Sequence, residues 1–166
     1  MKWIVKITLF LFIGLISCKG KQNKETATQK ISGEGINKVK LADLNGNAIE
    51  MSNYLGKTVF LNFWATWCKP CLLEMPSIKS AMEILNNKDI VFLFASDETA
   101  EQIENFKNKN EYNFNYVKAR NMEELGIMAL PTTYIFDNKG NLVFNKLGYR
   151  KWDEKENIDL IKKYTN

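Results

Sequence analysis

The 166-residue sequence contains no histidine and only three cysteines, Cys18, Cys68 and Cys71. A structural zinc site needs four ligands, usually two Cys-x-x-Cys pairs or one such pair together with histidines. Covalent haem attachment needs a histidine directly after the second cysteine of a pair, and Leu72 stands there instead. The composition therefore speaks against a metal site and excludes covalent haem, and we expect the protein to need no cofactor.

The sequence also lacks a strong excess of one charge. It has 23 Lys and Arg residues against 19 Asp and Glu residues, and these charges form no dense basic patch. Nucleic acid is therefore a poor candidate partner. Because 45% of the residues are hydrophobic, the chain has enough apolar material for the core of one ordinary domain.

The one long hydrophobic run lies at the N-terminus, over residues 7–16. This run is shorter than the roughly 20 residues that span a bilayer, and it has the length of a secretory signal's apolar region. Its ending, LISC, resembles the lipobox of bacterial lipoproteins. The resemblance implies a signal peptide over residues 1–17 and a lipid on Cys18, which would hold the protein on a membrane. An ordinary signal peptide or an uncleaved anchor is the alternative. Residues 18–34 are polar after Cys18, and we expect a flexible tether there.

Residues 35–166 carry the hydrophobic patterns of a single α/β domain. Apolar and polar residues alternate on both sides of Asn45-Gly46, which predicts a hairpin. The predicted order is this hairpin followed by β-α-β-α-β-β-α, which requires a mixed central sheet flanked by helices on both faces. The patterns predict buried strands at 58–65 and 89–96, two strands around 138–140, and helices at 70–85, 99–110 (begun by Thr99) and 153–164 (begun by Asp153).

Cys68 and Cys71 stand between a predicted strand and a predicted helix. Free backbone N–H groups and the helix dipole at a helix start stabilise a thiolate, Lys69 adds a positive charge, and Pro70 suits the first helical turn. These features make Cys68 the nucleophile and Cys71, one turn further on, the resolving cysteine. A purely structural disulfide is the alternative, but closing so short a loop stabilises a fold little. The pattern therefore favours thiol–disulfide exchange.

Three motifs carry a resemblance to a known family. The stretches NFWATWCKPC at 62–71, CLLEMP at 71–76 and LPTTYIFDNKG at 130–140 resemble, in this order, those of membrane-tethered thioredoxin-like proteins of the TlpA/ResA type. That branch includes the CcmG-type reductants of cytochrome c maturation. The resemblance implies a thioredoxin-like fold with an N-terminal β-hairpin extension, and an extracytoplasmic thiol–disulfide oxidoreductase.

The same resemblance assigns a proton acceptor to the site. Asn62 stands where thioredoxin has a buried Asp that handles protons for the resolving cysteine, and an amide cannot do this. Glu74, three residues after Cys71, lies on the same side of the predicted helix. Burial would raise its pKa and make it a proton acceptor for Cys71. A solvated helix carboxylate is the alternative.

The resemblance also places a substrate-docking surface around the pair. Pro131 matches the family's cis-proline, whose loop lies against the active-site sulfur, and an ordinary proline at a strand edge is the alternative. Trp64 is expected in the core. The residues expected to dock a substrate are Trp67, Lys69, Pro70, Leu130 and Pro131.

The direction of electron flow follows from what lies between the two cysteines. Oxidants of this fold carry a His there that stabilises the reduced form, whereas this chain has Lys69-Pro70, so we expect a reductant. We expect a monomer whose partners are a disulfide-bearing client protein and a membrane electron donor of the DsbD/CcdA type.

Two other functions remain as alternatives. One is a peroxiredoxin-like peroxidase, whose motif needs Pro at 61 and Thr at 65, where this chain has Leu61 and Ala65. The other is a non-catalytic, lipid-anchored binding module with a thioredoxin fold.

Overall fold

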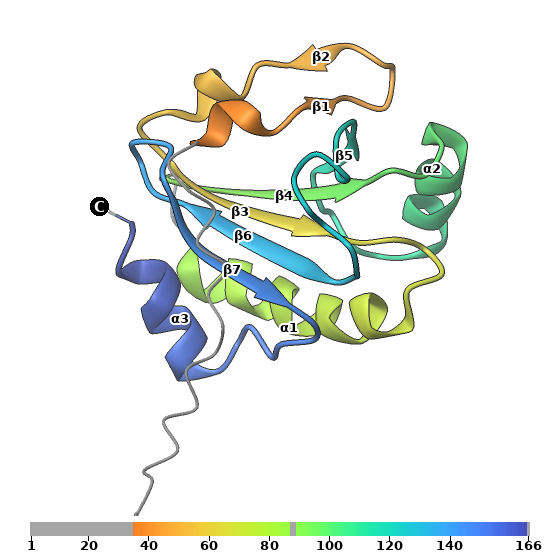
Figure 1. The fold of residues 1–166 in the computed structure, drawn as a ribbon. Coiled ribbons are helices and arrows are strands. Elements are labelled where there is room, and N and C mark those ends of the chain that lie inside the picture. The colour runs from red at the N-terminus through yellow and green to blue at the C-terminus, as the bar shows by residue number, and fades with distance from the viewer. Residues whose placement is uncertain (1–34, 87–88, 166) are drawn as a thin grey trace, which may run out of the picture.

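The computed structural model describes residues 35–86 and 89–165 of the chain. The signal peptide, the lipid site at Cys18 and the tether that we expect over residues 1–34 lie outside this part. Within it, no helix is both long and apolar enough to cross a bilayer. The elements are η1 Ile36–Lys38, β1 Leu41–Ala42, β2 Ala48–Ile49, η2 Met51–Tyr54, β3 Thr58–Phe63, α1 Lys69–Leu85, β4 Ile90–Ser96, α2 Ala100–Lys109, β5 Tyr116–Ala119, β6 Thr132–Phe136, β7 Leu142–Leu147 and α3 Lys155–Lys162 (Figure 1).

The strands form one mixed sheet of seven strands in the order β2-β1-β5-β4-β3-β6-β7. β3 lies inside the sheet, parallel to β4 and antiparallel to β6. All six of its residues are buried, as the apolar run at 58–65 predicts. Phe60 and Asn62 share one face of the sheet, whereas Val59, Leu61 and Phe63 share the other, because successive side chains of a strand point to opposite faces.

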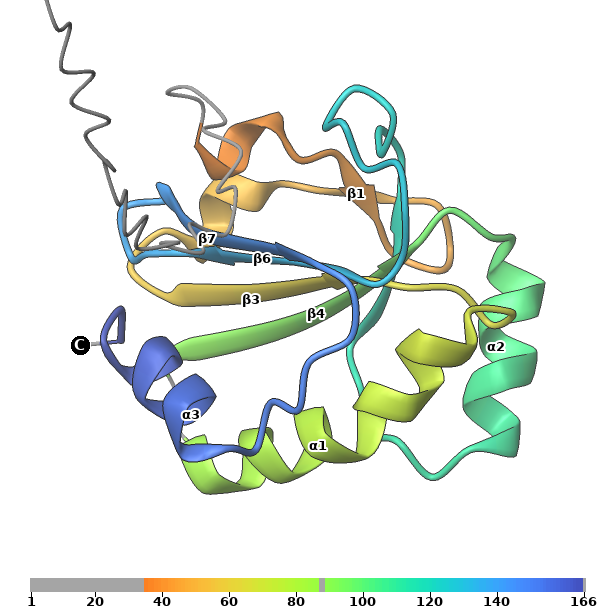
Figure 2. The ribbon, with the colours of Figure 1, turned by 60° about the horizontal axis from the view of Figure 1, so that its bottom comes forward.

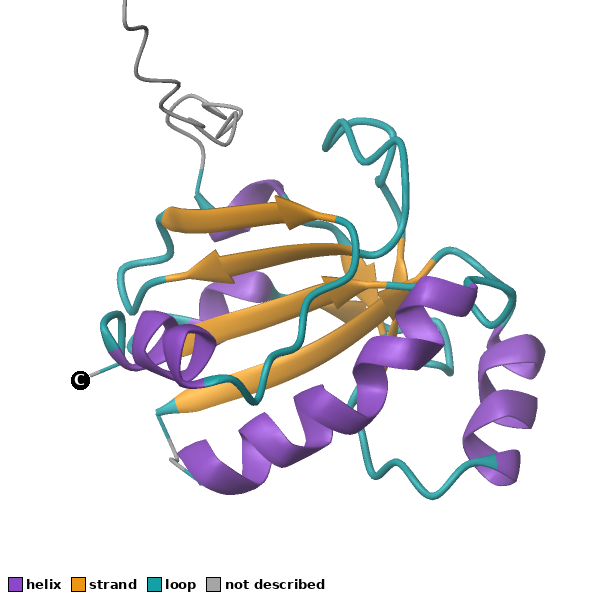
Figure 3. Cartoon of the chain, turned by 90° about the horizontal axis from the view of Figure 1, so that it is seen from below, coloured by secondary structure: helices purple, strands orange, loops and turns teal. Residues whose placement is uncertain are grey.

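The three α-helices cover the face of the sheet that carries Phe60 (Figures 2 and 3). Ile78 of α1, Ile103 of α2 and Ile158 of α3 belong to one apolar cluster with Phe60. The opposite face is covered by the short helices η1 and η2 and by the chain around Ile127. The predicted mixed sheet flanked by helices is confirmed, but within residues 35–86 and 89–165 only 3₁₀-helices lie on the second face.

The two predicted hairpins are present and share one turn chemistry. In β1–β2 and in β6–β7, Asp43 and Asp137 each accept a hydrogen bond of 2.8 Å from the backbone N–H of the Asn four residues later. Gly46 and Gly140 take the left-handed backbone conformation that such turns need, with φ of 92° and 79°. The N-terminal hairpin extends the central sheet, because β1 also pairs with β5.

Two details of the predicted order are wrong. The strand β5, four residues long, was not predicted; it pairs in parallel with β4 and antiparallel with β1. The helix α3 has Glu154 at its N-cap, without a side-chain hydrogen bond, and not the predicted Asp153. The start of α2 is as predicted, since the Thr99 hydroxyl accepts the Gln102 N–H at 3.2 Å and the Gln102 side chain accepts the Thr99 N–H at 3.0 Å.

Candidate active site

The two cysteines lie where the chain turns from β3 into α1. Cys68 is the N-cap of α1 and Pro70 is the second helical residue, as predicted. Cys68 and Cys71 form a disulfide with their Cα atoms 5.3 Å apart. The backbone N–H of Cys71 donates to the Cys68 sulfur at 3.3 Å. The start of the helix therefore already points a donor at the sulfur that would carry negative charge as a thiolate.

The two cysteines are buried, whereas several residues beside them are exposed to solvent. Cys68 is 4% exposed and Cys71 is 1% exposed, so Cys71 is the more buried of the two, although both are covered in this oxidised form. Trp67 is 72% exposed, and Lys69 and Pro70 beside it are also exposed. Trp64, by contrast, is fully buried, as predicted.

Glu74 is a fully buried carboxyl group one turn beyond Cys71. Its Oε1 accepts a hydrogen bond of 2.8 Å from Asn62, and its Oε2 accepts one of 3.2 Å from the backbone N–H of Arg150. The indole of Trp152 also faces Glu74, although it does not reach hydrogen-bond geometry. Like the two donors, it lowers the pKa of Glu74. Burial outweighs all three and raises the pKa of Glu74 from 4.5 to about 7. The expected burial of Glu74 is thus present, and the group can exchange a proton near neutral pH.

Asn62 connects Glu74 to the neighbouring strand β6. Its side-chain amide donates to Glu74 and, at 2.9 Å, to the Thr133 hydroxyl of β6. The residue is itself buried, 1% exposed. The Asn62 amide therefore has a structural task, since it holds the Glu74 carboxylate in place.

Pro131 lies at the same end of the sheet as the cysteines. The peptide bond between Leu130 and Pro131 is cis, as predicted. Thr132, the next residue, pairs with Phe63, the last residue of β3, from which the chain continues to Cys68. The Pro131 carbonyl accepts a hydrogen bond of 2.7 Å from the N–H of Gly148, so the loop after β7 meets the same region.

Sequence reasoning missed a second buried acid, Glu98. Its carboxylate accepts hydrogen bonds from the Thr66 N–H at 2.7 Å and from the Thr66 hydroxyl at 2.6 Å. Ser96 donates to the same carboxylate at 3.2 Å. Because Thr66 stands two residues before Cys68, Glu98 fixes the turn that leads to the cysteine pair. The only signal in the sequence was Thr66 between Trp64 and Trp67, and this pattern does not indicate that Thr66 bonds Glu98.

No cluster of three or more metal-ligating side chains occurs in the described part of the chain.

A cysteine pair at the start of α1, a cis-proline at the same sheet edge and a buried acid one turn below define a thiol–disulfide oxidoreductase with the thioredoxin fold. The sequence model of the AhpC/TSA family matches residues 32–145, and the chain belongs to this thioredoxin-like family.

Relatives with this activity in their names match most of the chain. The thiol-disulfide oxidoreductase ResA of Bacillus cereus is 31% identical over 98% of this chain and 94% of its own length. A solved structure assigned as a thiol-disulfide oxidoreductase of Bacteroides vulgatus is 25% identical, with a TM-score of 0.66 over 75% of this chain and 90% of that one. The exposed lipoprotein thioredoxin Etrx1 of Streptococcus pneumoniae is 26% identical, with a TM-score of 0.59 over 75% of this chain and 97% of its own.

Proposed function

We propose that this oxidoreductase reduces disulfide bonds of extracytoplasmic client proteins while a lipid on Cys18 holds it at a bacterial membrane. The observation that carries the proposal is the pairing of the Cys68–Cys71 unit with the buried Glu74. A structural disulfide has no need for a buried acid with a pKa of about 7 one turn away. A dithiol that must lose two protons to reduce a client does need such a group.

The reaction transfers two electrons in two steps. In the reduced protein, the Cys68 thiolate attacks one sulfur of the client disulfide, and the other client sulfur leaves as a thiolate. Cys71 then gives its proton to the Glu74 carboxylate and attacks Cys68. The second client sulfur leaves, and the Cys68–Cys71 disulfide remains, which is the form that the structure describes.

The docking surface that we propose is an apolar rim around the pair. Seven large hydrophobic side chains are exposed in the described chain. Five of them lie within three residues of Cys68, Cys71 or Pro131 in the sequence, or beside Gly148, whose N–H bonds the Pro131 carbonyl. Trp67 directly precedes Cys68. A client segment would lie between Trp67 and the Leu130-Pro131 loop. An extended, apolar client segment fits such a rim. The five are Trp67, Leu73, Met128, Leu147 and Tyr149.

The proposed location and partners have separate support. The lipobox at Cys18 suggests a lipid anchor, and one relative of this chain is named an exposed lipoprotein thioredoxin. A reductant outside the cytoplasm must be recharged, so we propose a membrane electron donor of the DsbD/CcdA type. Clients would be extracytoplasmic proteins that need reduced cysteines, with the apocytochromes c as one class.

Trapping of mixed disulfides in cells tests this proposal. In a Cys71→Ser variant the resolving step cannot occur, so clients should accumulate on Cys68 in complexes that dithiothreitol releases. The double variant Cys68→Ser, Cys71→Ser is the control and should trap nothing. Full biological activity of this double variant would instead favour the non-catalytic binding module.

The peroxidase alternative has a direct assay as well. The AhpC/TSA family match makes it worth testing, although Leu61 and Ala65 stand where the peroxidase motif has Pro and Thr. We expect no peroxide turnover above that of a free thiol. Rapid peroxide consumption that depends on Cys68 would overturn the proposed reductase function.

A further inference from the structure

The second hydrogen-bond donor of Glu74 comes from a loop. The connection between β7 and α3, residues 148–154, brings the backbone N–H of Arg150 to within 3.2 Å of Oε2 of Glu74. A backbone amide moves with its chain. Its position at the carboxylate therefore depends on the contacts that hold this connection in place.

One buried side chain of α3 holds two consecutive residues of the connection. Asn157 is 3% exposed. Its Nδ2 donates to the Lys151 carbonyl at 2.7 Å, and its Oδ1 accepts a hydrogen bond from Nε of Arg150. The Asn157 amide thus fixes the side chain of Arg150, whose backbone N–H bonds Glu74. It also fixes the backbone of the next residue, Lys151.

Ser77 of α1 holds the connection from the other side. Its hydroxyl accepts the Trp152 N–H at 3.1 Å and donates to the Glu74 carbonyl at 2.8 Å. The connection is therefore tied both to α3, through Asn157, and to the helix that carries Glu74.

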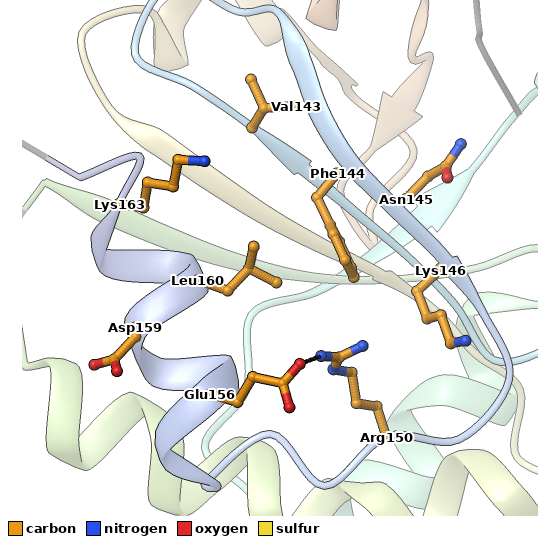
Figure 4. A pocket seen from close by; sticks show the side chains of 9 residues that line it. All are labelled: Val143, Phe144, Asn145, Lys146, Arg150, Glu156, Asp159, Leu160 and Lys163. Carbon is orange, nitrogen blue, oxygen red and sulfur yellow. Dashed lines mark hydrogen bonds and ion pairs between the residues drawn. The ribbon is translucent and has the colours of Figure 1, made fainter. Parts of the chain in front are cut away.

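The side chain of Arg150 contacts different partners from those of its backbone N–H. The guanidinium lies 5.5 Å from the ring centre of Phe144 and 5.7 Å from that of Trp152. It meets the exposed Glu156 carboxylate at 3.3 Å, at the groove between β7 and α3 (Figure 4). The positive charge is thus paired at the groove, while the backbone N–H of the same residue serves Glu74.

The groups that face Glu74 come from three parts of the chain. β3 contributes Asn62, which also binds Thr133 of β6, and the connection contributes the Arg150 N–H and the Trp152 indole. Cys71 precedes Glu74 by one turn on its own helix. Arg150 is the one charged residue of this set, so the carboxylate relies on oriented dipoles and not on an ion pair.

We propose that Asn157 is a positioning residue for the Glu74 carboxylate, because its two hydrogen bonds hold the Arg150 amide at Oε2. The catalytic meaning of this role rests on the proposed function, but the positioning itself can be measured without any reaction.

Loss of Asn157 has a predictable direction. A hydrogen bond to a carboxylate favours its charged form, so release of the Arg150 amide should raise the pKa of Glu74 further. A shift of about half to one pH unit is expected for one such bond. Since Glu74 accepts a proton only when it is ionised, the resolving step of Asn157→Ala should need a correspondingly higher pH.

A titration of Glu74 in the oxidised, full-length protein tests the inference. The Cys68–Cys71 disulfide carries no thiol proton, so the ¹³C signal of the Glu74 carboxyl, assigned with Glu74→Gln, reports this group alone. Asn157→Ala and, independently, Ser77→Ala should each move its midpoint upward by about half a unit or more. Glu156→Gln is the matched control: it also removes a contact of Arg150 from α3 but leaves Asn157 intact, and it should not move the midpoint.

The outcomes separate this inference from the proposed function. An unchanged Glu74 midpoint in Asn157→Ala overturns the positioning role, whatever Ser77→Ala shows. If Asn157→Ala does not fold, Asn157→Ser takes its place, and an unchanged midpoint in that variant overturns the role. A shifted midpoint combined with a resolving rate that Glu74→Gln leaves unchanged supports the positioning role and contradicts the proposed role of Glu74.

Discussion

The side-chain amide of Asn62 donates a hydrogen bond of 2.8 Å to the carboxylate of Glu74, and both residues are buried between β3 and α1. Asn62 thus brings a side-chain amide from the sheet to a buried acid of the facing helix. In the function that we propose, this acid is the proton acceptor on the helix that carries Cys71.

Replacement of Asn62 by Asp should make the protein less stable at alkaline pH. Two carboxyl groups in hydrogen-bond contact can share one proton, but both cannot be ionised at low cost. We expect a loss of about 3 kcal/mol in the free energy of unfolding at pH 8.5 and a clearly smaller loss at pH 5. Denaturant unfolding of the oxidised protein measures both values. Asn62→Ala removes the donor without adding a charge, and an equal pH dependence in both variants would contradict this account.

The raised pKa of Glu74 should appear in the pH dependence of stability. Between pH 4.5 and about 7 the folded protein binds more protons at this group than the unfolded chain does. The free energy of unfolding therefore falls as pH rises through this window, by up to about 3 kcal/mol from this group. Glu74→Gln lacks this component, so its stability relative to the parent should improve between pH 4.5 and 7. A parallel pH dependence of the two proteins would show that Glu74 titrates normally.

The Cys68–Cys71 pair should be reducing. No histidine stands between the cysteines to stabilise the thiolate form, since Lys69 and Pro70 occupy these positions. We expect a reduction potential closer to the roughly −270 mV of thioredoxin than to the roughly −120 mV of DsbA. Equilibration with glutathione or dithiothreitol buffers, followed by thiol alkylation, gives the value. The double variant Lys69→Pro, Pro70→His places a histidine before Cys71 and should be more oxidising than the parent.

The strands, helices and active-site positions were largely predictable because each depends on a local pattern. A few neighbouring residues were enough to predict the buried strand β3, the turn at Asn45-Gly46 and the helix start near Pro70. β5 was missed because four residues between polar stretches give no period, and the strand forms only through its pairing with β4 and β1. Its place in the sheet is a tertiary property.

The partners of Glu74 could not be predicted for the same reason. Its position three residues after Cys71 pointed to the active site, but the Arg150 amide reaches it across 76 residues of sequence. The hydrogen bonds from the Thr66 N–H to Glu98 and from the Trp152 N–H to Ser77 also join distant segments, 32 and 75 residues apart. Such hydrogen bonds depend on backbone groups that every residue has, and the sequence does not mark them.

In the function that we propose, Glu74 takes the proton of Cys71, and single-turnover kinetics of the resolving step test this role most directly. A mixed disulfide between Cys68 and a chromogenic thiol is formed, and its release by Cys71 is followed from pH 5 to 9. In the parent the rate should rise with pH around a midpoint near the pKa of Glu74, about 7. In Glu74→Gln it should fall about a hundredfold at neutral pH and lose that midpoint. Equal rates and equal midpoints in the two proteins would contradict the account.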